Sequence, residues 1–224
     1  MPRTIVFDVN ETLLDLASLD PLFETWFGNP DTRQEWFAQV LKSAFVAVAT
    51  GHYSDFSATG GAALTVIGQR HGVAITQAHR EALRDGMARL PAHADVEPAL
   101  RALRSAGLTL ATLTNNPPNV VQAQLRHADI DQHFDHILSV DTAGSLKPAP
   151  VVYRTAAREL GVETADIRMV AAHDWDVTGA QRAGCRAAFV ARPGQDFDPL
   201  GVRPDIVGPD LMRVAEAIIA AECH

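Results

Sequence analysis

Four short polar clusters in this chain contain side chains that can do chemistry. They comprise residues 8–12, residues 114–116, Lys147 with Pro148, and residues 173–176. The first cluster begins with Asp8, directly after an apolar run. A carboxylate in that place can attack a substrate as a nucleophile if a nearby cation keeps it ionised and aimed. We therefore expect Asp8 to be a nucleophile and Lys147 to supply a positive charge that could also bind a substrate carboxylate.

The clusters must be positioned by the elements that precede and follow them. Short apolar runs bounded by polar or turn residues are typical of buried parallel strands, and they cover residues 4–7, 108–113, 136–140, 167–172 and 187–190. Helical patterns cover residues 96–106, 120–127, 151–160, 177–183 and 210–221. Strands that alternate with helices predict βαβ units and a parallel sheet. We expect an α/β fold with a Rossmann-like core, in which the polar strand ends converge.

The first strand is followed by a long segment that interrupts this alternation. Residues 16–92 are almost wholly helical in pattern, with helices expected over residues 19–27, 32–49, 55–71 and 76–89. An insertion after the first strand lies over the carboxyl ends of the strands, where open α/β sheets bind ligands. The expected organisation is a core domain of residues 1–15 and 93–224 with a helical cap domain of residues 16–92.

Composition and charge narrow the class of partner. Apolar residues make up 47% of the 224 residues and charged residues 21%, as in ordinary globular proteins. A net charge of −8 disfavours binding to nucleic acids and anionic membranes, and no apolar stretch approaches the ~18 residues of a membrane-spanning helix. Two cysteines, one of them next to the last residue, suit a reducing cytosol without a structural disulfide. We therefore expect a cytoplasmic protein.

The polar clusters and their flanks also resemble a known family. The segments FDVNETLLD, LTNN, SLKPAPVVY and AAHDWDVTGA are similar, in order and spacing, to the four motifs of the haloacid dehalogenase superfamily. The resemblance covers nearly the whole chain. It implies that Asp8 forms a covalent aspartyl ester, that Thr12 orients it, and that Thr114 and Asn115 bind a substrate carboxylate. Tyr153, six residues after Lys147, matches a tyrosine of the dehalogenase branch.

Two departures separate this chain from the phosphatases of the superfamily. Asn10 stands where they have an aspartate that protonates the leaving alcohol, and an amide cannot transfer that proton. Ala171 and Ala172 stand where a Gly-Asp pair helps to hold Mg²⁺. Both losses indicate the 2-haloacid dehalogenase branch (type II), whose reaction needs neither a metal nor another cofactor.

The resemblance thus implies a reaction in two steps. Asp8 displaces halide from the α-carbon of a short 2-haloalkanoic acid, and water then hydrolyses the ester. Asp176 is expected to hold Lys147 or the hydrolytic water. His173 replaces an asparagine of the branch and is a candidate base, alone or paired with Asp174, because an unperturbed histidine has a pKa of about 6.5.

The remaining expectations concern the substrate and the cap. Asn10, Asn115 and Trp175 are candidate groups for the leaving anion. Phe37 occupies the cap position at which the branch has a halide-binding arginine, and Arg33, one turn earlier, either reaches the substrate or faces solvent. The partner is expected to be a small carboxylate, and the family's habit implies a homodimer.

Three alternatives remain open at this point. The first is an aspartyl-ester enzyme with another leaving group, such as one that opens a strained cyclic carboxylate. The second is a weak Mg²⁺-dependent phosphatase in which Asp174 replaces the missing ligand. The third is an idle member of the family that serves as a binding module.

Overall fold

The computed structural model describes residues 4–223, so the ends of the expected core domain, residues 1–3 and 224, lie outside it. A six-stranded parallel sheet has the strand order β3-β2-β1-β4-β5-β6. Strand β1 is central, and its last residue, Phe7, pairs with Thr112 of β2 and Val170 of β4. The bounds are β1 Thr4–Phe7, β2 Thr109–Thr114, β3 His136–Ser139, β4 Ile167–Ala171, β5 Arg186–Val190 and β6 Ile206–Gly208. The expected α/β fold class is confirmed.

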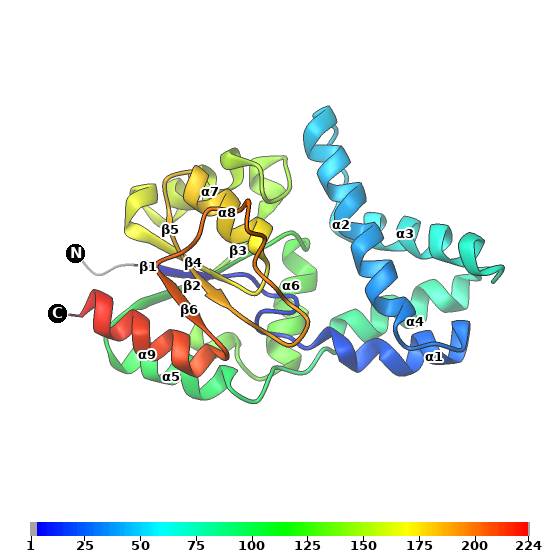
Figure 1. Cartoon of the computed structure of the whole chain (residues 1–224), viewed down its shortest axis with the longest axis horizontal. Coiled ribbons are helices and arrows are strands. Elements are labelled where there is room, and N and C mark those ends of the chain that lie inside the picture. The colour runs from blue at the N-terminus through cyan, green and yellow to red at the C-terminus, as the bar shows by residue number, and fades with distance from the viewer. Residues whose placement is uncertain (1–3, 224) are drawn as a thin grey trace.

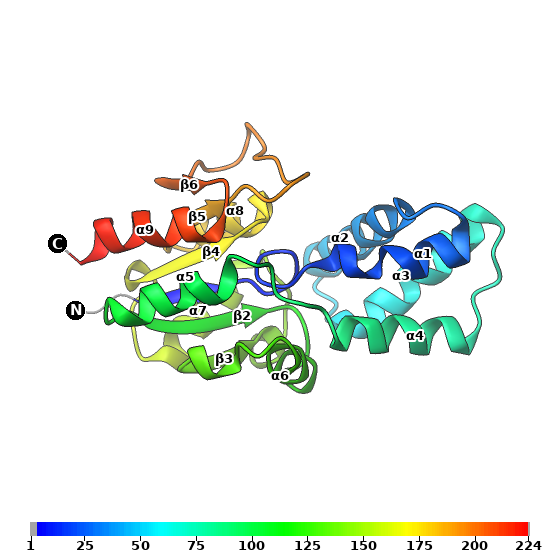
Figure 2. The same cartoon turned by 90° about the horizontal axis from the view of Figure 1, so that it is seen from below.

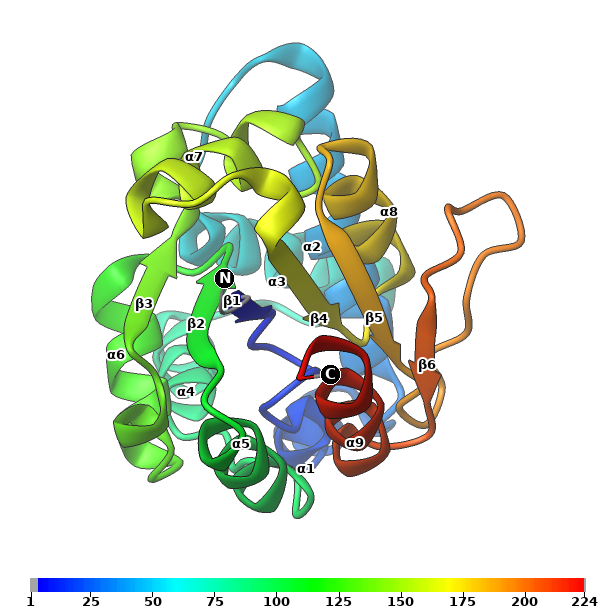
Figure 3. The same ribbon diagram turned by 90° about the vertical axis from the view of Figure 1, so that its left-hand side faces the viewer.

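Helices cover both faces of the sheet (Figures 1 and 3). One face carries α5 and α9, the opposite face carries α7 and α8, and α6 lies beside β3. This cover buries β1 completely, which explains why its sequence is continuously apolar rather than alternating. The helices are α5 Val96–Ser105, α6 Pro118–His127, α7 Pro150–Leu160, α8 Asp174–Arg182 and α9 Leu211–Glu222, with short 3-10 helices η2 Asp131–His133, η3 Val140–Ala143 and η4 Thr164–Asp166.

A second group of helices lies beyond the carboxyl ends of the strands (Figures 1 and 2). It consists of η1 Leu16–Leu19, α1 Asp20–Phe27, α2 Thr32–Thr50, α3 Phe56–His71 and α4 Gln77–Ala88. Phe23 and Trp36 are buried between these helices with their ring centroids 5.6 Å apart, which gives the group an apolar interior of its own. The inserted helical cap is therefore present, and it covers the edge of the sheet where the polar clusters lie.

The two connections between core and cap run side by side. The backbone N–H of Asp15 donates to Pro91 O at 2.8 Å, and the N–H of His93 donates to Leu13 O at 3.0 Å. Leu14 and Ala92 form an antiparallel bridge between the same segments. The cap is thus joined to the core through one paired crossing.

The structure corrects two expected elements. Helix α8 begins at Asp174 rather than at residue 177, because Asp174 and Asp176 in its first turn suit the positive end of the helix dipole. Strand β6 was not expected, since only three residues at the sheet edge form it and Val207 among them is exposed.

Two further findings on residues 4–223 concern the cysteines and the length of the helices. Cys185 and Cys223 are both free. Within the same residues, no helix has the length and apolar character that crossing a membrane requires.

Candidate active site

The turn after β1 positions the candidate nucleophile. The backbone N–H of Asp8 donates to Val170 O at 3.0 Å, which continues the pairing of β1 with β4. The chain then turns back through Glu11, whose φ of +62° is uncommon for a residue other than glycine. This turn brings the Thr12 hydroxyl to Asp8 Oδ2 at 2.7 Å, while the same hydroxyl accepts the N–H of Ala172 at 2.9 Å. Thr12 is therefore in direct contact with the carboxylate of Asp8.

The ammonium group of Lys147 lies between two buried carboxylates. Its Nζ is 2.8 Å from Asp8 Oδ1, 2.7 Å from Asp176 Oδ2 and 2.8 Å from Leu113 O. Burial lowers the pKa of Lys147, but Asp176 and Asp8 raise it above its usual value. Because an ammonium has three hydrogens and all three are used, the geometry does not support the expectation that Lys147 also binds the substrate carboxylate.

The charge state of Asp8 follows from these contacts. Burial raises the pKa of Asp8, but the cationic groups of Lys147 and His173 more than offset this and hold the pKa well below its usual value. Asp8 is only 5% exposed, yet it stays ionised at neutral pH. The ionised carboxylate is the form that can attack as a nucleophile.

Asp176 and Tyr153 lie behind Lys147. The Tyr153 hydroxyl donates to Asp176 Oδ1 at 2.6 Å, so both carboxylate oxygens of Asp176 are used. Both residues are almost completely buried. Asp176 thus contacts Lys147 directly. Tyr153 does not line the cavity in front of Asp8.

His173 lies between two carboxylates. Its Nδ1 is 3.2 Å from Asp8 Oδ2 and its Nε2 is 2.9 Å from Glu11 Oε2. Burial lowers the pKa of His173, but the hydrogen bonds and charges of Asp8 and Glu11 raise it to about 10. His173 is therefore a cation in the resting enzyme, and its acidic partner is Glu11 rather than the neighbouring Asp174.

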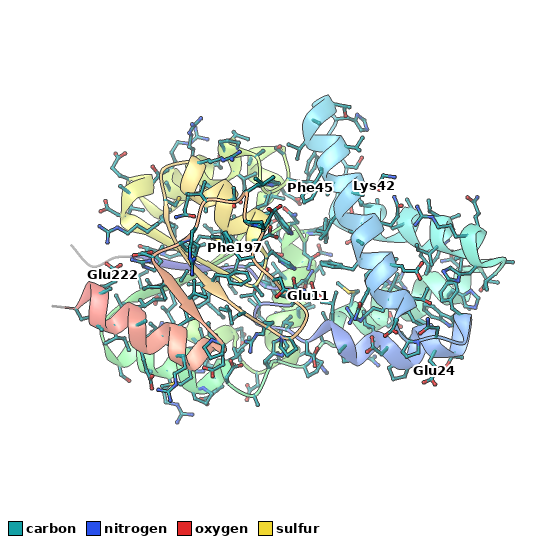
Figure 4. All side chains as sticks on the ribbon, viewed as in Figure 1. Glu11, Glu24, Lys42, Phe45, Phe197 and Glu222 are labelled. Atoms are coloured by element: carbon teal, nitrogen blue, oxygen red, sulfur yellow. The ribbon has the colours of Figure 1, made fainter. Side chains whose placement is uncertain are left out.

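Glu11 is a residue to which the sequence analysis gave no role. Its carboxylate also accepts Gln195 Nε2 at 3.2 Å and lies 3.4 Å from Arg33 Nη1. Figure 4 shows Glu11 at the junction between the sheet and helices α1–α4. Its place in the first polar cluster was a signal, but no spacing in the sequence indicated that its partner would be His173.

Arg33 takes neither of its two expected positions. It is 7% exposed, and its Nε donates to Asp20 Oδ1 at 2.6 Å while Nη1 faces Glu11. The guanidinium is therefore not in solvent, and it is not part of the pocket wall. Instead, Arg33 links cap helix α2 to the Glu11 turn of the core.

A small cavity opens in front of Asp8. It measures about 10 Å³, the room that one water molecule needs. Substrate entry therefore requires side chains from the cap to move. The cavity is lined by Asp8, Asn10, Phe37, Leu41, Phe56, Thr114, Asn115, His173 and Trp175.

Two groups in this wall matter for an anion. The indole N–H of Trp175 is buried and has no hydrogen-bond partner among residues 4–223. Asn115 also lines the cavity, and its Oδ1 accepts the backbone N–H of Lys147 at 2.9 Å, so its amino group is the part of the side chain that can donate. Phe37 lines the same cavity with an apolar ring.

Asn10 is held by two amides that the sequence analysis did not single out as binding groups. Its Oδ1 accepts Asn116 Nδ2 at 3.4 Å and Gln124 Nε2 at 3.3 Å. Gln124 also donates to Met87 O of α4 at 2.8 Å, so the network joins core and cap. Asn10 therefore serves as a fixed neutral amide in the cavity wall.

A second, larger cavity lies between the cap and α6. It has a volume of about 500 Å³ and is lined mainly by apolar side chains, among them Trp36, Val40, Leu83 and Val120. Phe56 lines both cavities, so its ring forms part of the wall between them.

The arrangement bears on metal binding as well. Within the part of the chain that the structure describes, no three His, Cys, Asp or Glu side chains are grouped so that they could hold a metal ion. Lys147 Nζ occupies the space between Asp8 and Asp176, and Ala172 offers no ligand atom. The residues present thus fit an ammonium at this place better than Mg²⁺.

These features define an α/β protein with a buried, ionised carboxylate at the carboxyl end of its central strand, and comparison with known proteins gives the family. The profile of haloacid dehalogenase-like hydrolases matches residues 2–184, and the chain belongs to this family. Haloacetate dehalogenase H-2 of Moraxella sp. (strain B) is 30% identical, with coverage of 96% of this chain and 97% of that protein. (S)-2-haloacid dehalogenase of Pseudomonas sp. (strain YL) is 31% identical, with coverage of 96% and 93%.

Solved structures agree with these relatives. The L-2-haloacid dehalogenase of Xanthobacter autotrophicus with chloropropionic acid covalently bound superposes with a TM-score of 0.90 at 26% identity, and the match covers 97% of this chain and 98% of that one. The similarity extends over core and cap together.

Proposed function

We propose that this protein is a hydrolytic dehalogenase that converts short 2-haloalkanoic acids to 2-hydroxy acids and halide. The observation that carries the proposal is the state of Asp8: a buried, ionised carboxylate between Lys147 and His173, open only to a small cavity. Relatives and solved structures named as 2-haloacid dehalogenases support the substrate class.

The reaction proceeds in two displacements. An oxygen of Asp8 attacks the α-carbon, a C–O bond forms, and the C–X bond breaks with both electrons leaving on the halide. Water then adds to Cγ of Asp8, the bond between Cγ and the ester oxygen breaks, and the 2-hydroxy acid leaves. The sum is a haloacid and water giving a hydroxy acid, halide and one proton. Lys147 and Thr12 stabilise the negative charge that builds on the Asp8 carboxyl group in the second step.

The substrate is held by neutral donors. Thr114 and the amino group of Asn115 bind the substrate carboxylate, and Asn10 fixes the position of the α-carbon substituent. The unpartnered indole N–H of Trp175 is the donor that receives the departing halide. No cofactor enters this scheme, because Lys147 supplies the charge that a metal ion supplies elsewhere.

The test is halide release from fluoro-, chloro- and bromoacetate and both enantiomers of 2-chloropropionate, with EDTA present. We expect release from at least chloroacetate and bromoacetate, and none from Asp8→Asn. Loss of activity on adding EDTA would favour the phosphatase alternative instead. A folded protein that releases no halide from any of these acids would overturn the proposal.

A second leaving group is favoured by one observation. Phe37 lines the cavity, and the guanidinium of Arg33 is engaged with Asp20 and Glu11, so among residues 4–223 no arginine lines the space around the leaving atom. A strained cyclic carboxylate needs no such cradle, because its leaving atom stays attached to the product. Incubation with azetidine-2-carboxylate or an oxirane carboxylate, followed by mass spectrometry for the addition of one water, separates this candidate from the first.

Three further points belong to the same proposal. We place the core domain at residues 1–15 and 93–224 and the cap at residues 16–92, supported by the paired crossing at Leu14 and Ala92. The enzyme works in the cytoplasm. It forms a homodimer, and size-exclusion chromatography with light scattering tests this oligomeric state. Its partners are small carboxylates rather than nucleic acids or membranes.

A further inference from the structure

The carboxylate of Glu11 and the imidazole of His173 have no assigned role in the two reaction steps of the proposed function. Their contact is 2.9 Å long, it joins residues 162 positions apart, and His173 is only 4% exposed. Glu11 is itself fixed by Gln195 and Arg33. Burial of two charged side chains costs desolvation free energy. We therefore read the pair of Glu11 and His173 as part of the site rather than as a surface ion pair.

The imidazole ring is fixed in orientation as well as in position. It stacks on Trp175 with ring centroids 5.0 Å apart and an interplanar angle of 21°, and the centroid of the Phe37 ring lies 5.9 Å from that of the imidazole. Nε2 faces Glu11 and Nδ1 faces Asp8. When His173 is neutral, its remaining proton belongs on Nε2, where Glu11 accepts it, and the Nδ1 lone pair then points at the Asp8 carboxyl group.

We propose that His173 is the base of the ester-hydrolysis step, that it becomes able to act only after Asp8 has been esterified, and that Glu11 is its positioning residue. The inference rests on the proposed function, because it needs the aspartyl ester. It differs from a resting-state base, since His173 is held as a cation by two carboxylates until the first displacement occurs.

The charge balance explains the order of events. In the resting enzyme the carboxylates of Asp8 and Glu11 both keep His173 protonated. Esterification removes the charge of Asp8, so only Glu11 still favours the cation, the pKa of His173 falls, and His173 releases one proton to solvent. The other charged or titratable groups around the pair are Lys147 beyond Asp8, and Arg33 and His93 beside Glu11.

The protons of the second step can then be followed. Nδ1 of His173 takes one proton from the water that adds to Cγ, and the imidazolium gives it to the departing alkoxide oxygen. Asp8 is left as a carboxylic acid, and it returns its proton to His173 as the resting ion pair forms again. The proton released earlier is the one that the overall reaction produces.

The test separates ester formation from ester hydrolysis. Enzyme in excess is mixed with chloroacetate and quenched at intervals, and both chloride and the adduct on the Asp8 peptide are quantified by mass spectrometry. In His173→Asn we expect one equivalent of chloride and a persistent adduct, with hydrolysis slowed by about 10²- to 10⁴-fold, the usual contribution of a general base. Asp196→Asn, which removes an exposed carboxylate near Gln195, is the matched control and should hydrolyse the ester like the wild type.

Glu11→Gln tests the positioning role. We expect hydrolysis to slow by about 10- to 100-fold, the worth of one charge-assisted hydrogen bond, while the chloride burst remains. Because Glu11 raises the pKa of His173, the acidic limb of the hydrolysis rate should move to lower pH in Glu11→Gln. A limb that stays in place would overturn the role of Glu11.

The wild type supplies a measurement that does not depend on folding of a variant. The Asp8 pKa is far below neutral, so ester formation continues in mild acid, whereas protonated His173 slows hydrolysis. The fraction of enzyme trapped as ester should therefore rise as pH falls. Ester that His173→Asn hydrolyses at the wild-type rate, or a trapped fraction independent of pH, overturns this inference alone. Absence of any ester in the wild type removes the proposed function with it.

Discussion

At the scale of single residues, the site depends on one ammonium that serves two buried carboxylates. Replacing Lys147 with methionine leaves Asp176 buried without a cation and leaves Asp8 with His173 alone. We expect halide release to be lost and the free energy of unfolding at pH 7.5 to fall by about 3–5 kcal/mol. Urea denaturation followed by circular dichroism measures the loss.

The pH dependence of this loss has a definite sign. Without Lys147 the pKa of buried Asp176, already above its usual value, rises further, so this carboxylate destabilises the fold while it is charged and ceases to do so once it is protonated. The loss of unfolding free energy in Lys147→Met, relative to the wild type, should therefore become smaller as pH falls from 7.5 to 5. In the double variant Lys147→Met/Asp176→Asn it should be smaller at every pH. A loss of unfolding free energy that becomes larger in acid would contradict the role of the buried charge.

His173 gives a second prediction with the opposite sign. Its pKa rises from 6.5 in the unfolded chain to about 10 in the fold. A raised pKa contributes stability that is complete below pH 6.5 and is lost as pH rises through 10. The difference in unfolding free energy between wild type and His173→Asn should therefore decrease from pH 6 to pH 10. Denaturation curves at several pH values in this interval decide the matter.

Trp175 offers a test of the leaving-group site. Phenylalanine at this position keeps the stacking on His173 but removes the unpartnered indole N–H. Loss of one donor to a developing anion slows a step by about 10²- to 10³-fold. Chloride release from chloroacetate in a single turnover should slow by that order in Trp175→Phe. An unchanged rate would mean that the halide leaves toward another group.

At the scale of elements, the position of β1 between β2 and β4 creates the site. Asp8 follows β1, Thr114 ends β2, and His173 follows β4 by two residues, so adjacent strands deliver these groups to one edge. Helix α8 starts at Asp174 and places Asp176 in its first turn, where the positive end of the helix dipole favours a carboxylate and where Asp176 contacts Lys147.

The opposite end of β4 carries a separate buried cation that secures the outer strands. Arg168 is fully buried and donates to Asp205 before β6, to Glu222 at the end of α9 and to Ala187 O. Arg168→Met should lower the unfolding free energy by about 3–5 kcal/mol, with unchanged KM for chloroacetate in the folded fraction. A large change in KM without loss of stability would show that this end of the sheet communicates with the site.

At the scale of the whole molecule, core and cap enclose two cavities of very different size. Phe56 forms part of the wall between the cavity of about 10 Å³ at Asp8 and the cavity of about 500 Å³ beside α6. Phe56→Ala should connect them and allow longer acids to bind. Burial of each methylene group is worth about 0.8 kcal/mol, or roughly fourfold in affinity.

The measurement is kcat/KM for racemic 2-bromobutyrate and 2-bromohexanoate relative to bromoacetate. The ratio should rise in Phe56→Ala and remain at the wild-type value in Val46→Ala, a change at an exposed residue of α2. A ratio that does not rise would show that the two cavities are separated by more than this ring.

The sequence by itself determined the sheet, the inserted helices and the strand ends at which the polar residues gather. Apolar runs, helical periodicity and turn residues are local signals, so elements could be placed to within a few residues. The pairing of Asp8 with Lys147 was also expected, because both residues follow the motif order of the family.

Only the tertiary structure decided which charges meet across long distances in the chain. Glu11 reaches His173 because β1 and β4 are neighbours, and Arg33 reaches Glu11 because the cap packs over that turn. It also decided that all three Lys147 hydrogens are used and that His173 is a cation at rest. Such pairings depend on strand order and on packing between core and cap, and on the burial that changes each pKa, none of which a local pattern contains.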